Sequence, residues 1–254
     1  MDVQGFLAVR SAAMISQTHR CIFVHVPKTA GQSIEQVFLT QLRLEWKQRA
    51  PLLLRRNRDP RKGPPRLAHL RASEYVDLGY CDLDTFSTFY RFSFVRNPWD
   101  RIVSFYKYIG SPAEYPFRDF VLHHLPNGLW SRMHWFVRPQ TDFLYRDGKL
   151  LVDFVGRFES LAEDFTHVAG QLDLPTRELP FVNRSDARRS PVYPAIRRTL
   201  KALWPGSPAF GNFGGRPLTR YPDFAAYYDR DTCDVIARLY ASDIEAFGYH
   251  SPLG

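Results

Sequence analysis

The chain has 254 residues, with 34 Lys and Arg against 26 Asp and Glu, and a formal net charge of +8. Hydrophobic residues make up 44% and aromatic residues 15%, which excludes a disordered, collagen-like or fibrous chain. Arg supplies 28 of the 34 cations, and its planar five-donor group matches phosphate, sulfate and carboxylate. An anionic ligand is therefore the first expectation, although GC-rich coding produces the same bias.

The three cysteines, Cys21, Cys81 and Cys233, lie far apart in the sequence and form no C-x-x-C pair. This pattern predicts free thiols, without a disulfide framework or a zinc site. No apolar run approaches the ~20 residues that span a bilayer, and Met1–Arg20 lacks the apolar region of a signal peptide. We therefore predict a cytoplasmic protein with no stable membrane insertion and no metal.

The first predicted element is a buried strand over Cys21–Val26, which is rich in β-branched and aromatic residues and ends at Pro27. A turn of small residues follows over Thr29–Ser33. Apolar residues then recur at helical spacing at Ile34, Val37, Phe38 and Leu42. The order is strand, tight loop, helix.

Residues 43–71 hold ten Lys and Arg, four prolines and only two acidic residues. We predict a basic, partly mobile connection there rather than a core element. Residues 184–222 form a second basic segment, rich in proline and glycine.

A second strand is predicted over Tyr90–Val95, followed by Asn97 as helix N-cap and Pro98 at the first helical position. The helix continues through Tyr106. Because strand, loop and helix occur twice in order, the sequence predicts an α/β fold with a parallel sheet.

The rest of the chain predicts shorter elements. They are helical pieces over Phe117–His124 and Trp130–Phe136, a hairpin over Asp142–Phe158 turning at Asp147-Gly148, a helix to Leu172 opened by a Ser160/Glu163 capping box, and a final helix over Asp231–Phe247.

The most informative motif is His25–Ser33, in which Lys28 leaves the first strand and small residues lead into a helix. The N-terminal amides and the helix dipole favour an anion there, and Lys28 adds a full positive charge. The hydroxyls of Thr29 and Ser33 can donate further, and Gly31 allows close approach of the backbone. The motif is not Walker A, because the lysine precedes the glycine. A tight turn with an incidental lysine is the alternative.

Arg96 ends the second strand, where it can reach a ligand at the carboxyl edge of the sheet. Asn97, Arg101 and Ser104 share one stripe of the following helix. A capping residue with a solvated Arg and Ser is the alternative. Two such turns can each hold one phosphate of a single nucleotide.

These two motifs, His25–Ser33 and Phe94–Tyr106, resemble those of the sulfotransferases that use 3′-phosphoadenosine 5′-phosphosulfate (PAPS). The resemblance is strongest to the carbohydrate branch, with its heparan 2-O- and chondroitin 4-O-type enzymes and bacterial relatives. Further similar stretches are His69–Glu74, Pro139–Gln140, Asp153–Glu159 and Val182–Ser185.

The resemblance implies a P-loop-like three-layer fold, in which helices flank a central, mostly parallel sheet. It implies a single sulfotransferase domain over residues 20–254, with basic inserts at about 43–71 and 185–220. Residues 1–19 would be an N-terminal extension, with Met14 as a candidate start. Animal relatives are anchored in the Golgi, and no anchor is predicted in this sequence. A bacterial cytoplasmic enzyme is therefore the expectation for this chain.

The implied reaction moves the sulfuryl group of PAPS in line to a carbohydrate or glycoconjugate hydroxyl, leaving 3′-phosphoadenosine 5′-phosphate (PAP), without a metal. Lys28 would neutralise the bridging and leaving oxygens. The 5′-phosphosulfate would lie in a cradle of Thr29, Ala30, Gly31, Gln32 and Ser33. Arg96 and Ser104 would hold the 3′-phosphate, and Arg184 would close over the nucleotide.

His69 resembles the catalytic histidine of the 2-O-type relatives and is the candidate general base, with Glu159 and His134 as alternatives. A structural histidine is the competing interpretation. The basic inserts either recruit an acidic glycan or form a solvated surface. Two other functions are alternatives to the transferase. One is an inactive binder of anionic glycan or nucleic acid, and the other is a P-loop kinase, which is disfavoured because the glycine–lysine order of Walker A is missing. We predict no nucleic-acid partner; the acceptor's identity and the oligomeric state stay open.

Overall fold

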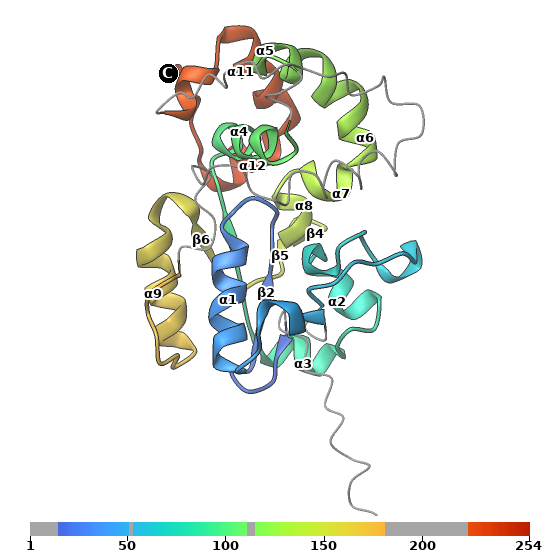
Figure 1. Ribbon diagram of the computed structural model, residues 1–254, viewed down its shortest axis with the longest axis vertical. Coiled ribbons are helices and arrows are strands. Elements are labelled where there is room, and N and C mark those ends of the chain that lie inside the picture. The colour runs from blue at the N-terminus through green and yellow to red at the C-terminus, as the bar shows by residue number, and fades with distance from the viewer. Residues whose placement is uncertain (1–14, 51–52, 111–114, 181–222) are drawn as a thin grey trace, which may run out of the picture. The chain divides into compact units, whose positions relative to one another are not determined.

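The computed structural model describes residues 15–50, 53–110, 115–180 and 223–254 (Figure 1). The chain divides into two compact units, each taken by itself below. The first unit comprises Met1–Arg96 with Gln140–Val182, and the second comprises Asn97–Pro139 with Asn183–Gly254.

A four-stranded sheet organises the first unit, in the order β1-β2-β3-β6. The strands are β1 (Ile15–Ser16), β2 (Cys21–Val24), β3 (Tyr90–Val95) and β6 (Phe154–Arg157). β2, β3 and β6 are parallel to one another, with Phe23 opposite Phe92 and Phe92 opposite Phe154. β1 pairs antiparallel with β2, so the sheet starts at Ile15, before the first predicted strand at Cys21.

Helices and turns complete this unit. They are α1 (Gly31–Gln41), η2 (Trp46–Gln48), η4 (Pro60–Lys62), η5 (Leu67–His69), α2 (Glu74–Asp77), α3 (Leu83–Thr88), α8 (Thr141–Leu144), η8 (Phe158–Ser160) and α9 (Leu161–Gln171). Figure 1 shows α1 running back beside β2 after the loop that joins them. This crossover allows β2 and β3 to be parallel. The prediction of an α/β fold with a mostly parallel sheet and helices is therefore confirmed.

Aromatic packing holds the sheet to its helices. The rings of Phe23 and Phe92 stack on adjacent strands with their centroids 5.1 Å apart. The ring centroid of Phe38, in α1, lies 6.3 Å from that of Phe92. The hydroxyl of Tyr75, in α2, donates to the carbonyl of Phe23 at 3.0 Å. Buried aromatic rings of this size contribute most of a core's apolar area, so these contacts fix α1 and α2 on the sheet.

The first strand is shorter than predicted, because β2 ends at Val24 and not at Val26. The carbonyl of His25 accepts from the side chain of His69, and the carbonyl of Val26 accepts from the hydroxyl of Thr29. These two backbone groups are thus bonded to side chains and do not continue the ladder.

The basic segment 43–71 was predicted to be a basic, partly mobile connection rather than a core element, but its described part does contribute to the core. Leu53, Leu54, Leu67 and Leu70 are all buried. An antiparallel bridge joins Arg56 to Arg66. The segment carries its charges on a folded loop whose two ends are anchored in the core.

The predicted hairpin over Asp142–Phe158 is only partly present. β4 (Tyr145–Arg146) and β5 (Lys149–Leu150) do turn at Asp147-Gly148, both at positive φ. The residues after this turn leave the hairpin, and β6 pairs in parallel with β3.

The Ser160/Glu163 capping box predicted for α9 does not form. The Ser160 hydroxyl instead donates to Asp164 at 2.7 Å, and the same carboxylate accepts from the amide of Arg157 at 2.6 Å. In a capping box, the two side chains would satisfy one backbone amide each. Asp164 alone satisfies two donors, which explains why the box does not form.

The second unit contains α4 (Pro98–Tyr108), α5 (Phe117–Asp119), the π-helix η7 (Phe120–Leu129), α6 (Trp130–Arg132), α7 (His134–Val137), η9 (Phe224–Tyr227), α11 (Arg230–Leu239) and α12 (Ala241–Phe247). Asn97 caps α4 as predicted, accepting from the amides of Trp99 and Asp100. The indole of Trp99 donates to the carbonyl of Cys233 at 3.3 Å. This contact joins α4 to α11.

Two helix predictions in this unit are corrected. The pieces expected on either side of Pro126 are joined, because the wider π-helical turn continues through a residue that an α-helix excludes. The single final helix is broken at Tyr240, whose backbone leaves helical geometry. The buried Tyr240 hydroxyl donates to the carbonyl of Val137 at 2.6 Å, which fixes the break.

All three cysteines are free thiols, as predicted. Burial raises the pKa of the Cys21 thiol to about 12. Within the described ranges, no helix is both long enough and apolar enough to cross a bilayer.

The substitution Gly156→Ala, in β6, tests the packing of the sheet. A Cβ at this position would lie 2.5 Å from the buried ring of Phe94. We expect Gly156→Ala to lower the free energy of unfolding by about 1–3 kcal/mol, because the ring has no space into which to move. Urea unfolding measures this change.

Gly170→Ala is the matched control, since a Cβ at this exposed position in α9 meets no atom within 4 Å. Here the same substitution should stabilise by about 0.5–1 kcal/mol through helix propensity. Equal effects at the two glycines would contradict the packing described for β6.

Candidate functional site

The candidate site lies at the carboxyl edge of the parallel sheet in the first unit. β2 leads into the loop that carries Lys28, Arg96 directly follows β3, and β6 leads into Phe158. The carboxyl ends of parallel strands meet at one edge, which is where ligands bind in α/β sheets.

The loop between β2 and α1 has a strained backbone. Lys28 (φ 71°) and Ala30 (φ 68°) both adopt the left-handed conformation, although neither is glycine. Each such residue costs on the order of 1–3 kcal/mol, and strain of this kind concentrates at functional sites. Ala30 is also the N-cap of α1, and no side chain caps this helix end.

A buried His25–Glu35 pair holds the loop from beneath. Nδ1 of His25 donates to Oε1 of Glu35, in α1, at 2.6 Å, and both side chains are buried. The other edge of the His25 ring lies against Gly31, where a Cβ would come within 2.0 Å of Nε2. Only glycine fits at this position, so the ring sets where α1 begins.

His69 is fixed by the backbone of His25. Its Nδ1 lies 3.1 Å from the carbonyl of His25, and the two rings meet edge to face at 4.5 Å. Because a carbonyl only accepts, Nδ1 must carry the hydrogen, and the lone pair of a neutral His69 is on Nε2. A base needs this tautomer to present Nε2 to a substrate.

Lys28 has an unusual acidity. Burial, and secondly the positive charge of Arg96, lower its pKa to about 7. A cation held in such surroundings gains from an anion placed beside it, because the anion offsets both effects. Lys28 therefore has the character of an anion-binding lysine with perturbed titration.

Arg96 is held by both its backbone and its side chain. The side-chain amide of Gln140, which is fully buried, accepts from the Arg96 amide at 2.9 Å and donates to its carbonyl at 2.8 Å. The guanidinium lies 3.8 Å above the ring of Phe158 and donates to the carbonyl of Lys28 at 3.3 Å. These contacts bring the cation of β3 to the loop of β2.

The first unit contains most of the predicted site residues: Lys28, Thr29, Ala30, Gly31, Gln32, Ser33, His69, Arg96 and Glu159. The hydroxyl of Thr29 donates to Val26 and is fully buried, so Thr29 can offer a ligand only its amide. The amide of Ser33 donates to the carbonyl of Ala30 at 2.9 Å. Glu159 is exposed, in η8.

Two other predicted residues, Ser104 on α4 and His134 on α7, belong to the second unit, and Arg184 lies outside the described residues. Arg101, on the same stripe as Ser104, is not solvated. It is buried and donates to the carbonyls of Phe136 and Arg138, both at 2.9 Å. Arg101 is therefore a structural residue of the second unit.

The sequence analysis gave no individual role to Glu35, Gln140 or Phe158, and none to His25 beyond its place in the His25–Ser33 motif. Glu35 carried a usable signal, because it is an acidic residue among the apolar positions of the first predicted helix. Gln140 and Phe158 lie in stretches that resemble the family, but their contacts with Arg96 join distant parts of the chain and could not be predicted.

Comparisons with known proteins identify the family to which the chain belongs. The model of the sulfotransferase family matches residues 11–250, so the chain belongs to the sulfotransferase family. An uncharacterized protein of Archaeoglobus fulgidus is 34% identical over 87 residues, covering 33% of this chain and 68% of that protein. No solved structure matches the chain. Among the described residues, no group of three His, Cys, Asp or Glu side chains could hold a metal ion.

Gly31→Ala tests the role of the His25 ring. We expect a loss of about 1–3 kcal/mol in the free energy of unfolding, because the new methyl group meets a ring that Glu35 holds in place. The double variant His25→Ala/Gly31→Ala removes this collision. It should therefore be more stable than the sum of the two single variants predicts, by about 0.5–3 kcal/mol. Urea unfolding of all four proteins measures the coupling, and strict additivity would show that the ring does not restrict position 31.

Proposed function

We propose that the protein transfers a sulfuryl group from PAPS to a hydroxyl of a carbohydrate acceptor. The observation that carries this proposal is the loop from Lys28 to Ser33, in a chain of the sulfotransferase family. The loop combines a lysine of lowered pKa with a helix start that has no capping side chain, and the His25 ring packed against Gly31 holds it in place. The lysine and the uncapped helix start both favour a bound anion with several oxygens.

Each residue of the loop has a definite part in this proposal. The first amides of α1 would point at the 5′-phosphosulfate, and Lys28 would offset negative charge on the bridging and leaving oxygens. Arg96 would hold the 3′-phosphate, with Ser104 and Arg184 as its proposed partners. Gln140 fixes the backbone of Arg96, and Phe158 lies under its guanidinium.

The acceptor hydroxyl would lose its proton to Nε2 of His69. The donor supplies the activated sulfuryl group; its S–O bond to the phosphate breaks as a new S–O bond forms to the acceptor oxygen. Like phosphoryl transfer, this reaction depends on positioning and on stabilised charge more than on covalent catalysis by the protein. Lys28 and His69 therefore have separate parts, one on the leaving group and one on the nucleophile.

An inactive binding protein is less consistent with these contacts. A protein that only binds an anion gains nothing from a histidine whose hydrogen bond leaves its lone pair on Nε2. The proposed base and the lysine stand on separate elements, η5 and the β2–α1 loop.

Donor binding should take up a proton at Lys28. Because the pKa of this lysine is lowered to about 7, the free protein loses the charge as pH rises through 7, while a bound anion favours the charged form. We expect the affinity for PAP, measured by calorimetry without magnesium, to fall by up to tenfold per pH unit between pH 7 and 9. Lys28→Met should weaken binding at pH 7 and remove most of this slope.

Lys149→Met is the matched control for this measurement, because Lys149 is exposed on β5 and lies outside the proposed site. It should bind PAP with the slope of the wild type. A slope that survives in Lys28→Met would remove Lys28 from donor binding. Stabilisation by ATP with Mg²⁺ alone, and not by PAP, would overturn the proposed function.

His69→Asn tests the general base. The Asn amide can still donate to the carbonyl of His25, so the fold should hold while the basic nitrogen is lost. We expect kcat for transfer of labelled sulfate from PAPS to fall by about 10²–10⁴, with PAP affinity unchanged. A panel of glycans and small alcohols serves as acceptors.

His250→Ala is the control for this measurement, since His250 is exposed near the C-terminus. It should keep the wild-type rate. If Glu159→Gln lowers kcat and His69→Asn does not, the base is Glu159, and the assignment of His69 fails.

A further inference from the structure

A second feature of the first unit is a basic loop that we call the basic hairpin, Arg55–Arg66. Arg56 and Arg66 form an antiparallel bridge, and the amide of Asn57 donates to the carbonyl of Pro65 at 2.8 Å. The amide of Leu67 donates to the carbonyl of Arg55 at 3.2 Å. The hairpin is thus closed by backbone hydrogen bonds at its base.

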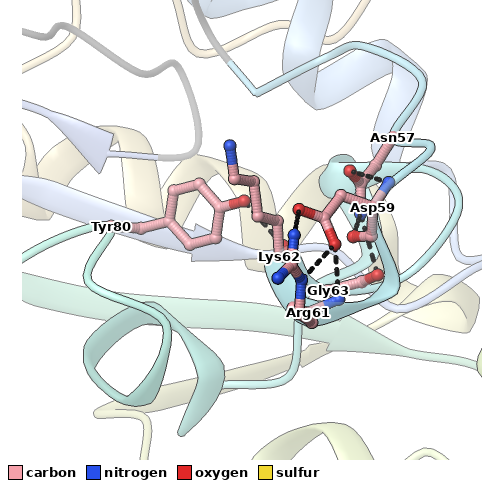
Figure 2. Close-up of polar contacts among 6 residues, drawn as sticks. All are labelled: Asn57, Asp59, Arg61, Lys62, Gly63 and Tyr80. Atoms are coloured by element: carbon pink, nitrogen blue, oxygen red, sulfur yellow. Dashed lines mark hydrogen bonds and ion pairs between the residues drawn. The ribbon is translucent and has the colours of Figure 1, made fainter.

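The side chain of Asn57 organises the inside of this hairpin, as Figure 2 shows. Its Nδ2 donates to the carbonyls of Asp59, Gly63 and Pro64, at 2.8, 2.9 and 3.2 Å. Its Oδ1 accepts from the amide of Asp59 at 3.1 Å. One half-buried amide therefore satisfies both arms of the loop, which a merely solvated connection does not require.

The tip of the hairpin is fixed from outside as well. The Tyr80 hydroxyl donates to the carbonyl of Lys62 at 2.6 Å (Figure 2). Gly63 follows at φ 113°, a conformation that side chains rarely adopt, and a Cβ there would lie 2.8 Å from Leu70. The backbone that carries the charges is therefore held in one conformation.

The outer surface of the hairpin is cationic. Arg55, Arg56, Arg58, Arg61 and Lys62 are exposed, and Asp59 is the one acidic residue in the segment. Asp59 accepts from Nε and Nη2 of Arg61, at 3.0 and 3.1 Å. The segment contains no aromatic residue, and its flanking leucines, Leu54 and Leu67, are buried.

The hairpin runs directly into the candidate base. The amide of His69 donates to the carbonyl of Arg66 at 3.0 Å, so η5 continues from the closing arm of the hairpin. His69 is the third residue after Arg66, which limits the separation of the two to roughly 10 Å. The hairpin therefore lies close to the candidate base along the chain.

We propose that the basic hairpin binds sulfate or carboxylate groups that the acceptor glycan carries beside its reacting hydroxyl. The inference rests on the proposed function and deepens it, since it names a polyanionic glycan as the acceptor. Arg matches the geometry of both groups, and a backbone that is already fixed reduces the entropy lost on binding. Single-stranded nucleic acid needs aromatic platforms and a membrane surface needs exposed apolar side chains, and the hairpin offers neither.

Binding assays with three variants test this proposal. The probes are a sulfated oligosaccharide, an unsulfated polyuronate and a neutral oligosaccharide of equal length, measured by calorimetry at 0.15 M salt. Arg58→Gln/Lys62→Gln removes two hairpin charges, and Asn57→Ala keeps every charge but removes the internal scaffold. Lys149→Gln/Arg177→Gln removes two exposed cations elsewhere in the same unit.

We expect wild-type protein to bind one or both anionic probes and not the neutral one. The hairpin charge variant should weaken this binding at least tenfold and Asn57→Ala three- to tenfold, while the control pair changes it less than twofold. Whichever anionic probe binds more tightly identifies sulfate or carboxylate as the group that is recognised. Wild-type binding by Asn57→Ala, or equal losses in the hairpin and control pairs, would show a solvated charge only and overturn the proposal. Equal or tighter binding of single-stranded RNA or of anionic vesicles would overturn it as well.

Tyr80→Phe keeps the test decisive if Asn57→Ala does not fold. It removes a single hydrogen bond to Lys62 and should weaken anionic binding two- to threefold; unchanged affinity would contradict the proposed role of the fixed tip. PAP affinity should stay constant in every hairpin variant. Protein that binds PAP but none of the glycan probes would overturn this inference alone, and protein that binds glycan but not PAP would overturn the donor site alone.

Discussion

The position of His25 is the constraint on which the rest of the site depends. Glu35 holds one edge of its ring, Gly31 packs against the other, and its carbonyl fixes His69. One residue thus connects β2, α1 and η5 at the edge of the sheet. Breaking a buried, hydrogen-bonded pair of this kind costs several kcal/mol, so loss of the His25–Glu35 pair would destabilise all three elements.

The loop above His25 departs from several rules of stable local structure at once. Two non-glycine residues are left-handed, α1 starts without a capping side chain, and a lysine lies where burial lowers its pKa. Such departures persist only where surrounding contacts determine the conformation, here the His25–Glu35 pair and the Gln140–Arg96 clamp. A bound anion relieves two of them, because it gives the helix amides a partner and restores the charge of Lys28. The loop is therefore complementary to an anion even though it is costly to fold.

Much of the fold and part of the site could be read from the sequence, because they depend on local patterns. β3 and the Asn97 cap appear where strand and capping propensities placed them. The errors come from contacts between distant residues. β2 ends early because His69, 44 residues further on, takes the carbonyl of His25, and residues 55–66 form a closed loop because Asn57 joins its two arms. No periodicity records such contacts, and the clamp of Gln140 on Arg96 was missed for the same reason.

The cations of the two proposed sites, the Lys28 loop and the basic hairpin, are held in different ways. Lys28 and Arg96 are part-buried and fixed by β2, β3 and Gln140, so changing them also disturbs the sheet edge. The cations of the basic hairpin are exposed, on a loop whose conformation depends on Asn57 and Tyr80 and not on their own side chains. They can be exchanged without loss of core packing, since an exposed side chain contributes little to stability. Under the proposed function, an enzyme built in this way can alter the acceptor that it recognises while its donor loop stays the same. His69 connects the basic hairpin to the loop after β2, because its amide donates to the carbonyl of Arg66 and its ring to the carbonyl of His25.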